Sequence, residues 1–281
     1  MNNSESVSTI TTFRTLHASG CFIIPNPWDI GSAKILHHLG FKALATTSAG
    51  FAFSQGLPDT ATALSLDMVL SHCRDIVAAT PLPVNADFQA GYANNLEGLA
   101  ENVKLCVQTG VAGLSIEDAT GDAANPLYER EVAIERVRAA RAAIDATGSG
   151  VLLTARCEAW LVNYPDCEKV ALDRLVAYAE AGADCLYAPR VQDLDAISRI
   201  VKAVAPKPVN VLVVAPAPGL NLRQLADLGV RRISVGSALS RVALGAFQRA
   251  AEEIAKTGKF DRLGESAAFS ELNEIFAREK P

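Results

Sequence analysis

The chain lacks the long apolar runs, the excess of basic residues and the leader pattern that mark several classes of protein. None of its apolar runs approaches the roughly 18 residues that a membrane span requires. Residues 1–12 are polar and rich in Ser and Thr, and they contain no charged segment followed by an apolar core. Acidic and basic residues are interspersed, with a net charge of -5, so no basic stripe is available for nucleic acid. We therefore expect a cytoplasmic protein that binds neither membranes nor nucleic acids.

Cysteine and histidine are scarce and poorly placed for their usual chemical roles. The chain has 6 cysteines, no two of them at CxxC spacing, and a chain of 281 residues needs no disulfide to stabilise its core. We expect free, mostly buried thiols, with Cys157 as the one of interest because it lies between two charged residues. The 4 histidines fall on predicted helices or before the first predicted strand, which disfavours chemistry built on a histidine-paired nucleophile.

Short β-branched runs alternate with helical patterns along the whole chain. The runs predict strands over 21–25, 43–47, 84–87, 113–117, 151–155, 185–187, 209–213 and 232–235. Helical periodicity and terminal glycines predict helices over 31–39, 65–79, 96–109, 129–146, 166–181, 194–204 and 222–228. This alternation indicates an α/β fold of the (β/α)8 barrel type. A Rossmann fold would need GxGxxG after the first strand, where this chain reads "PNPWD".

No interdomain linker interrupts the repeat, so we expect a single barrel domain over residues 1–281. Residues 244–281 are extra to a minimal barrel and form a C-terminal extension. The extension contains one predicted helix that ends near Thr257 and a second that starts at about Glu265. We expect this extension to pack on a neighbouring subunit.

Charged residues follow several predicted strands at the point where each strand ends. The carboxyl ends of the strands form the catalytic face of a (β/α)8 barrel, so these side chains should converge on one mouth: Asp87, Glu117, Asp118, Arg156 and Glu158. Asp87 and Glu117, with Asp29 and Asp59 nearby, suit Mg2+, which takes one or two carboxylates plus waters and substrate oxygens. The alternative is that these acids cap the following helices.

Two further features of this mouth have alternative interpretations. Arg156 presents a guanidinium that could bind a carboxylate or phosphonate in a bidentate manner, unless it forms a structural ion pair with Glu158 or Glu117. Residues 118–128 are rich in Gly, Ala, Asn and Pro, which indicates either a mobile loop of lid length or a passive surface loop.

The small residues over 46–51 follow the second predicted strand. Their side chains allow close approach to the backbone, so the N–H groups and the Thr47 and Ser48 hydroxyls could cradle a carboxylate or an oxyanion. The alternative is an ordinary tight turn between a strand and a helix. The composition of the segment does not decide between the two.

Five ordered motifs carry a resemblance that spans about residues 13–263. They read "NPWDIGSAKILHHLGFKALATTSAG", "PVNADFQAGY", "GVAGLSIED", "ARCEAW" and "PVNVLV". With these motifs the sequence resembles the isocitrate lyase/phosphoenolpyruvate mutase superfamily. The resemblance implies a (β/α)8 barrel with a swapped C-terminal helix, usually assembled as a dimer of dimers. It also implies Mg2+ or Mn2+ acting on an α-oxo acid or its enolate.

The resemblance assigns substrate contacts by position. Thr47, Ser48 and Ala49 are similar to the loop that holds the substrate carboxylate and carbonyl. Asn210, in the motif "PVNVLV", is a further substrate-binding residue. Arg156 matches the arginine that grips the substrate and is also counted as catalytic.

The resemblance also assigns metal-side and catalytic positions. Asp87 is similar to the principal metal-side carboxylate, and Glu117 to the acid that hydrogen-bonds the metal waters. Gln89 stands where a second acid is common, so we expect weaker metal binding. Asp59 matches an acid in the segment after the second strand, and Asn125 falls where a gating loop has an asparagine.

The chain departs from the family pattern in the segments that distinguish its reactions. The loop "ATGDAANPLYE" lacks the Lys-(Lys/Arg)-Cys-Gly-His sequence of the carbon–carbon lyases. Ala123 stands at the loop lysine of the mutases and phosphonopyruvate hydrolases, and Ala188 stands at a histidine that the mutases use. The parts that polarise an α-oxo acid are intact: the metal side, the carbonyl cradle and the arginine.

These features predict a Mg2+-dependent lyase that cleaves a C–C bond of an α-oxo or 2-hydroxy di- or tricarboxylic acid through a pyruvate-type enolate. Oxaloacetate decarboxylation and alkylmalate or methylisocitrate cleavage are examples. Tyr187, Tyr128 and Asp122 are alternative proton donors. A P–C bond enzyme, of the phosphonopyruvate hydrolase or mutase type, and a catalytically silent α-oxo acid binding protein are the alternatives. We expect a small carboxylate as substrate and a homo-oligomer, dimer or tetramer.

Overall fold

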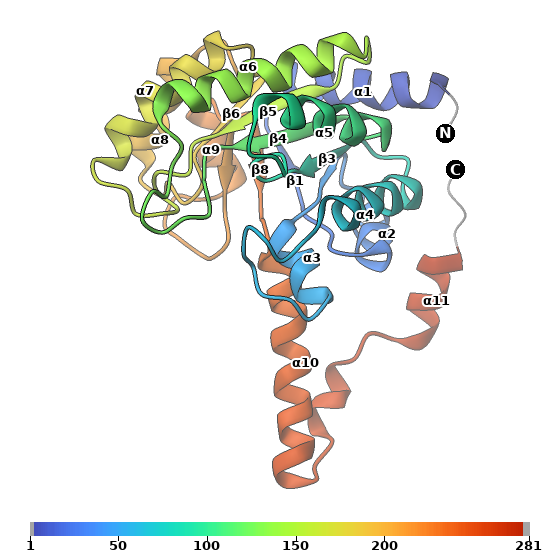
Figure 1. Ribbon diagram of the computed structural model, residues 1–281. Helices are drawn as coiled ribbons and strands as arrows, with labels where there is room; N and C mark the ends of the chain where they lie inside the picture. Colours follow the sequence, from blue (N-terminus) through green and yellow to red (C-terminus); the bar gives the residue numbers. More distant parts are fainter. Residues whose placement is uncertain (1–2, 278–281) are drawn as a thin grey trace.

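Eight parallel strands form the centre of the molecule, and each is followed along the chain by a helix (Figure 1). The computed structural model describes residues 3–277. The strands are β1 (Phe22–Ile24), β2 (Leu44–Ala45), β3 (Val84–Asp87), β4 (Gly113–Glu117), β5 (Leu152–Arg156), β6 (Cys185–Tyr187), β7 (Val209–Leu212) and β8 (Arg232–Ser234). Their hydrogen-bonded order is β1-β8-β7-β6-β5-β4-β3-β2. The predicted (β/α)8 barrel is therefore confirmed.

The predicted helices lie within one residue of their expected bounds. They are α2 (Ile30–His38), α4 (Leu66–Ala79), α5 (Leu96–Gln108), α6 (Arg130–Ala146), α7 (Cys167–Glu180), α8 (Leu194–Val204) and α9 (Leu222–Asp227). Two further helices, α1 (Asn3–Ala18) and α3 (Ser48–Ser54), were not predicted. Gly40, Gly110 and Gly182 have φ values of 83°, 90° and 105°, so glycine at these positions lets a helix end and turn directly into the next strand.

The barrel closes at a seam between β1 and β2, where one residue after β1 bridges three segments. The Ala45 N–H donates to the Pro25 carbonyl at 3.0 Å. The Asn26 side-chain amide donates to the Thr46 carbonyl at 3.0 Å, and its Oδ1 accepts from the Gly236 N–H at 2.9 Å. Asn26 thus holds the carboxyl ends of β1, β2 and β8 together, which fixes the mouth of the barrel.

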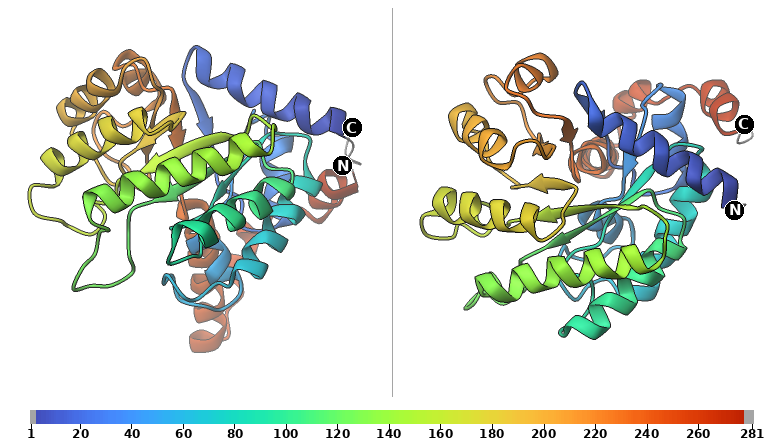
Figure 2. Two further views of the ribbon diagram at one scale, coloured as in Figure 1. Left: turned by 45° about the horizontal axis from the view of Figure 1, so that its top comes forward. Right: turned by 90° about the horizontal axis from the view of Figure 1, so that it is seen from above.

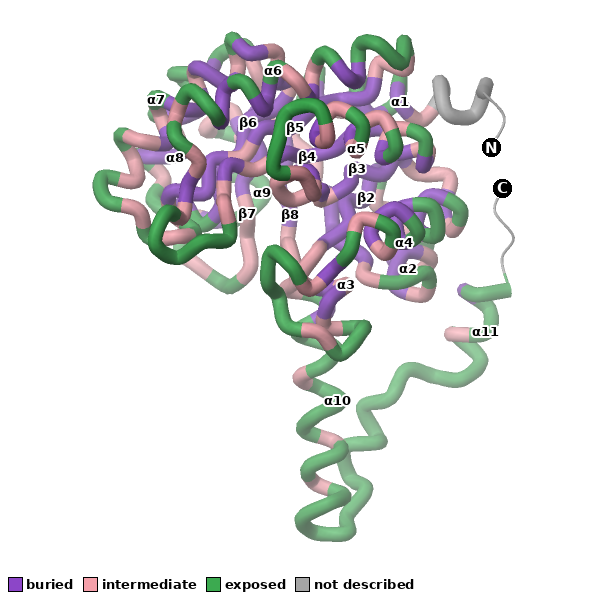
Figure 3. Tube along the Cα trace, viewed as in Figure 1, coloured by how far each residue is buried: buried purple, intermediate pink, exposed green. Residues whose placement is uncertain are grey.

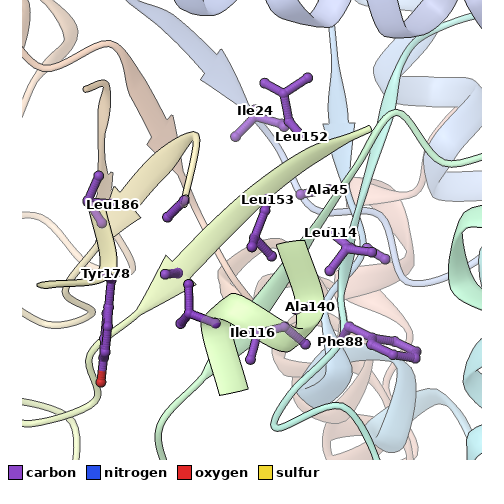
Figure 4. Close-up of a cluster of buried hydrophobic side chains, with 14 of the residues drawn as sticks. Ile24, Ala45, Phe88, Leu114, Ile116, Ala140, Leu152, Leu153, Tyr178 and Leu186 are labelled. Atoms are coloured by element: carbon purple, nitrogen blue, oxygen red, sulfur yellow. The ribbon is translucent and has the colours of Figure 1, made fainter. Parts of the chain in front are cut away.

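The apolar core lies between the outward faces of the strands and the surrounding helices (Figure 4). Successive side chains point to opposite faces of a strand. Leu114 and Ile116 of β4 are therefore packed in this core, while Ser115 and Glu117 between and after them line cavities inside the barrel. The strands bury apolar residues outside the barrel and direct polar residues to its axis.

Helix α1 lies across the amino-terminal end of the barrel, away from the end where α10 leaves (Figures 1 and 2). Phe13 is fully buried, and its ring meets the His17 ring edge-on with centroids 4.5 Å apart. A Cβ at Gly113 would come within 2.7 Å of the Phe13 ring, so a glycine is needed there for α1 to approach the barrel. Helix α1 therefore closes the floor of the barrel.

The C-terminal extension leaves the barrel as a long helix, α10 (Ala238–Thr257), followed by a short 3-10 helix (Asp261–Glu265) and α11 (Phe269–Ala277). The second helix of the extension begins at Phe269, later than expected. Most of α10 is exposed (Figure 3), including Phe247 at 72% exposure, whereas Ile275 of α11 is buried and the Lys34 ammonium of α2 donates to the Phe276 carbonyl. The last residues of the extension, 278–281, lie outside the described part of the chain.

No helix within residues 3–277 combines the length and the apolar character that crossing a membrane would require.

Candidate active site

Asp87, Glu117 and Arg156 end three neighbouring strands, and the strand register brings their side chains to one edge of the barrel. Glu117 of β4 pairs directly with Arg156 of β5. Asp87 of β3 pairs with Ser115 of β4, two residues before Glu117. Parallel strands that end together place their last inward side chains around one opening. The predicted convergence of these three residues is therefore observed.

The Arg156 guanidinium binds three carboxylates at once. Its Nη1 donates to Asp87 Oδ1 at 2.7 Å, its Nη2 lies 3.2 Å from Glu117 Oε2, and its Nε donates to Glu158 Oε1 at 2.8 Å. Glu158 is fully buried, and its second oxygen has no hydrogen-bond partner. The ion pairs that were one of the two interpretations of Arg156 are thus present, and the cluster keeps an excess of negative charge.

Burial is the largest influence on the acid–base properties of these carboxyl groups. Burial raises the pKa of Glu117 to about 8, against the opposing effect of the Arg156 guanidinium. Desolvation, and then the negative charge of Asp87, raise the pKa of Asp59 above its ordinary value. A cation among these groups would favour their ionised forms, so the cluster is suited to bind one.

Helix α3 fixes the orientation of Asp87. The Ser48 N–H and hydroxyl both donate to Asp87 Oδ2, at 2.9 and 2.8 Å. The Thr47 hydroxyl caps α3 by accepting from the Gly50 N–H, and the Asp87 N–H donates to the Thr46 hydroxyl. The expected carboxylate cradle at these residues is therefore a short capped helix whose first groups hold a protein carboxylate.

Two cavities meet at the acid–arginine cluster. A cavity of about 370 Å3 extends into the barrel and is lined by Thr47, Ser48, Ala49, Asp59, Asp87, Arg156, Tyr187 and Asn210, among others. A second cavity of about 730 Å3 lies beside it and is lined by Gln89, Glu117 and Tyr128. Ser48, Asp59 and Arg156 line both. The residues expected to bind the substrate or the metal all border one of the two cavities, whereas Asp29, Asp118, Asp122, Asn125 and Glu158 border neither.

Tyr187 and Asn210 belong to a hydrogen-bonded chain on the far wall of the first cavity. The Arg156 guanidinium lies 5.1 Å from the centre of the Tyr187 ring. The Tyr187 hydroxyl is hydrogen-bonded to the Ser234 side chain, and burial raises the pKa of Tyr187, so the phenol stays protonated. The Asn210 amide donates to Ser234 Oγ at 2.9 Å. This wall presents a neutral, oriented hydroxyl to the cavity.

One charged residue expected at the mouth faces away from it. Asp118 accepts from the Glu158 N–H at 2.8 Å, from Arg174 Nη1 at 2.9 Å and from the Tyr178 hydroxyl at 2.7 Å. Asp118 therefore anchors the end of β5 to α7 and does not line either cavity. The expectation that Asp118 would converge on the opening was wrong, because adjacent residues at a strand end point to opposite faces. Glu158 joins the cluster through Arg156 Nε, but it is fully buried and lines neither cavity.

The loop after β4 is folded back on itself, and Asn125 lies at its exposed end. Ala119 and Leu127 form an antiparallel bridge, and the Thr120 N–H donates to the Pro126 carbonyl. The Asn125 amide donates to Asp122 Oδ2 at 3.1 Å. In this conformation Asn125 borders neither cavity, and its predicted gating role stays a prediction.

The remaining thiols and imidazoles do not contribute reactive groups to the site. The cysteines are free, and Cys157 is fully buried with its pKa raised by burial, so it stays a thiol. Burial lowers the pKa of His17 to about 3 and that of His72 to about 4. Both histidines are therefore neutral packing residues, as expected.

Two polar residues of β8, Arg232 and Ser234, also line the first cavity and were not predicted. Arg232 donates through Nε to Asn210 Oδ1 at 2.9 Å and through Nη2 to the Thr154 hydroxyl at 3.1 Å. The signal was present in the sequence, since "RIS" alternates polar and apolar residues and the polar ones had to face the barrel axis.

The donor groups at the mouth match the chemistry of a hard divalent cation. Asp87 and Glu117 supply carboxylate oxygens that face the cavities, and no soft ligand lies beside them. Within residues 3–277 no cluster of three or more His, Cys, Asp or Glu side chains is arranged to hold a metal. Mg2+ needs only one or two carboxylates, because it keeps several waters and binds substrate oxygens. Asp87 and Glu117 therefore fit such an ion.

Comparison with known proteins places these features in a family. The family model for phosphoenolpyruvate phosphomutase matches residues 13–255. The chain is 31% identical to the 2-methylisocitrate lyase of Salmonella typhimurium, over 79% of this chain and 75% of that protein. It is 32% identical to the oxaloacetate decarboxylase of Chromohalobacter salexigens, over 80% of this chain and 78% of that protein.

A solved structure from Burkholderia cenocepacia J2315, described as a lyase/mutase, superimposes with a TM-score of 0.94. It is 45% identical in sequence, and the match covers 98% of this chain and 99% of that one. The fold, the order of the strand-end residues and these matches agree. The chain is an enzyme that belongs to the isocitrate lyase/phosphoenolpyruvate mutase superfamily.

Proposed function

We propose that the protein is a Mg2+-dependent carbon–carbon lyase that acts on an α-oxo or 2-hydroxy di- or tricarboxylic acid and forms a pyruvate-type enolate. The observation that carries this proposal is the cluster of three carboxylates around the single Arg156 guanidinium, beside a cavity with room for a small acid. The excess negative charge favours a divalent cation, for which Mn2+ would also serve. Asp87 and Glu117 are the residues that would hold it.

The chain's own residues orient the substrate and carry the proton. The bound cation supplies Lewis-acid stabilisation of the negative charge that develops as the C–C bond breaks. Ser48 holds the Asp87 carboxylate in place, and the Thr46 hydroxyl holds the Asp87 backbone by accepting from its N–H. Two N–H groups of the Arg156 guanidinium remain for a substrate carboxylate beyond the three that bind protein acids. With oxaloacetate, CO2 leaves, the electron pair of the broken C–C bond enters the pyruvate enolate, and its C3 then needs one proton. With a 2-hydroxy acid, the hydroxyl proton is lost as the carbonyl of the oxo acid forms, the electron pair goes to the α-carbon of the departing acid, and that carbon needs the proton.

Tyr187 is the donor that the geometry favours for this proton. It lines the first cavity beside Arg156, and its raised pKa keeps a proton on Oη at neutral pH. Asp122 is exposed in the loop, where hydrogen bonds from the backbone of Ala124 and then from the Asn125 side chain lower its pKa, so it carries no proton to give. Tyr128 lies in the other cavity, with the Arg136 guanidinium 4.5 Å from its ring centre.

A substrate panel tests the reaction class. Release of the oxo-acid product is measured with Mg2+ on oxaloacetate and methylisocitrate (pyruvate), isocitrate (glyoxylate) and alkylmalates (the corresponding 2-oxo acid), and phosphate release on phosphonopyruvate, each with and without EDTA. We expect turnover of one of the C–C substrates that EDTA abolishes. Turnover of phosphonopyruvate alone would transfer the protein to P–C chemistry. Ligand-induced stabilisation without turnover of any substrate would contradict the lyase proposal and favour a binding protein.

A pair of tyrosine variants tests the proton donor. Tyr187→Phe should lower kcat by about a hundredfold or more, as expected for loss of a general acid. Tyr128→Phe, in the neighbouring cavity, is the matched control and should keep kcat within about threefold, less than about 0.7 kcal/mol. Equal effects of the two variants, or a larger effect at Tyr128, would exclude Tyr187 as the donor.

We also propose that the C-terminal extension packs on a second copy of the chain. Phe247 and Val242 of α10 are 72% and 67% exposed, and Phe269 at the start of α11 is 85% exposed, which is unusual for large apolar side chains on a monomer. Light scattering after size exclusion should give a dimer or tetramer. Phe247→Ser should shift the mass toward the monomer, and a monomeric wild-type protein would contradict the proposal.

A further inference from the structure

The layer of side chains beneath the acid–arginine cluster is polar. Asn85, Ser115 and Thr154 each lie two residues before Asp87, Glu117 and Arg156 on β3, β4 and β5, so they point to the same side of their strands. Barrel interiors of this fold are usually filled by Val, Ile and Leu. Here the first cavity continues past the cluster and is lined by Asn85 and Ser115 of this lower layer. The polar interior of the barrel below the cluster therefore belongs to the candidate active site.

A buried cation forms the floor of this cavity. Arg232 of β8 is 3% exposed and borders the cavity together with Asn210. Its guanidinium contacts Asn210 Oδ1, Thr154 Oγ1 and His17 Nε2, at 2.9, 3.1 and 3.3 Å. Thr154 is two residues before Arg156 on β5, which is about 6.6 Å of strand rise. The two guanidinium groups thus belong to successive layers of one cavity.

None of the groups that face Arg232 carries a negative charge. His17 Nδ1 lies 2.8 Å from the Phe13 carbonyl and donates its proton to it, which leaves Nε2 as a neutral acceptor for Arg232. Burial raises the pKa of Cys185, so this neighbour stays a thiol. Across residues 3–277, no carboxylate forms an ion pair with Arg232. A buried cation without a counter-ion is costly, and an anion that enters the cavity would offset that cost.

The guanidinium also retains capacity to bind such an anion. A guanidinium carries five N–H donors, and three of those of Arg232 are used by Asn210, Thr154 and His17. Two N–H groups of Arg232 therefore have no partner among these three residues, and Arg232 lines the first cavity. Guanidinium geometry matches a carboxylate better than it matches the neutral acceptors around it.

We propose that Arg232 is a second anion-binding group of the site, which takes the distal carboxylate of a dicarboxylate whose other end lies at the acid–arginine cluster. The inference rests on the proposed function only for the location of the substrate. It narrows the substrate class to acids that carry two carboxylates far enough apart to reach both layers. Monocarboxylates of similar size would leave the floor cation without its counter-ion.

Binding without turnover tests this subsite. Calorimetric titrations with succinate and with acetate are made in EDTA, so that no metal takes part. The wild-type protein should bind succinate, and Arg232→Met should weaken succinate binding at least tenfold while acetate binding stays within twofold. Arg232→Lys keeps the charge and loses the planar fork, so its affinity for succinate should be intermediate. Succinate affinity in Arg232→Met within twofold of wild type would overturn the proposal.

Arg136 provides a matched control for the loss of a buried arginine. It is 2% exposed, and its guanidinium donates to the Ala90 and Ala93 carbonyls, which border the second cavity but not the first, where the subsite lies. Within residues 3–277, no carboxylate forms an ion pair with Arg136. Arg136→Met should keep the succinate affinity of the wild type. If the Arg232 variants fail to fold, a crystal structure of the wild type with succinate decides: a carboxylate on the Arg232 guanidinium supports the subsite, and one bound only at the mouth overturns it.

Failure of the subsite and failure of the lyase reaction give different results. Arg232-dependent succinate binding together with silence in the substrate panel would remove the reaction and keep the subsite. Turnover of a dicarboxylate by the wild type, with an unchanged KM in Arg232→Met, would keep the reaction and remove the subsite.

Discussion

Arg156 and Arg232 line the same cavity, but the groups around Arg156 are acidic and those around Arg232 are neutral. Arg156 contacts three carboxylates, whereas Arg232 contacts an amide, a hydroxyl and a neutral imidazole. The mouth therefore has excess negative charge and the floor has excess positive charge. The comparison shows that an arginine can neutralise protein carboxylates at the mouth, as Arg156 does, and keep its charge for a ligand anion at the floor, as we propose for Arg232. What each arginine does follows from its neighbours.

The largest effect is expected from removal of the Arg156 guanidinium at the mouth. Arg156→Met would leave Glu158 buried without its partner, which should cost about 3–5 kcal/mol of unfolding free energy. We expect kcat/KM to fall at least about a hundredfold, or 2.7 kcal/mol. Urea unfolding and steady-state kinetics measure the two effects. A loss of kcat/KM below tenfold would show that Arg156 does not hold the substrate.

Arg130→Met is the control for Arg156→Met. Arg130 pairs with Asp173 and Glu131 on the exposed surface, and such pairs contribute little. Its substitution should leave both the unfolding free energy and kcat/KM close to those of the wild type.

A smaller effect is expected when the negative charge of the mouth is reduced at Asp87. Asp87→Asn removes one carboxylate, keeps the shape, and should raise the Mg2+ concentration for half-maximal activity by tenfold or more, about 1.4 kcal/mol. Asp122→Asn, in the exposed loop, should leave the Mg2+ dependence unchanged. Activity of Asp87→Asn with the Mg2+ requirement of the wild type would remove Asp87 from the metal site.

The smallest expected effect concerns His17, which contacts Arg232 at the floor of the cavity and should make the stability of the protein depend on pH. The pKa of His17 falls from 6.5 to about 3 on folding, because of burial and then the Arg232 charge, so the unfolded chain takes up a proton that the folded one refuses. Stability should therefore decline as the pH drops from 6.5 toward 3, by up to about 1.4 kcal/mol per pH unit from this group. His17→Gln should flatten the decline in urea unfolding between pH 6.5 and 4. An unchanged slope would mean that His17 is protonated beside Arg232.

Much of the fold and part of the site could be predicted from the sequence because both follow local patterns. The β-branched runs and terminal glycines located the strands and the helices between them to within one or two residues. Helix α1 was missed because its residues are mostly polar, and it folds against the barrel through only a few residues, such as Phe13. Helix α3 was taken for a turn because its small residues give no helical periodicity.

The site could be predicted only as far as strand ends reveal it. Asp87, Glu117 and Arg156 follow from their positions, since parallel strands end together. The orientation of Asp118 depends on the alternation of side chains at the strand end, and that of Asn125 on how the loop folds. Arg232 lies at the start of a strand, where no catalytic residue is expected, and its role depends on neighbours from three other elements.

Deuterium incorporation shows whether C–C cleavage leaves a carbanionic carbon that the enzyme protonates. The C–C substrate identified in the panel is turned over in D2O with Mg2+, and the products are trapped at once by reduction and examined by NMR. We expect one deuterium at the carbon that takes the electron pair of the broken bond, in excess of that found when the product alone is incubated with the enzyme. This carbon is C3 of pyruvate when the substrate is oxaloacetate, and the α-carbon of the released acid when the substrate is a 2-hydroxy acid. Product without solvent deuterium at that carbon would contradict an intermediate that is protonated from an exchangeable group.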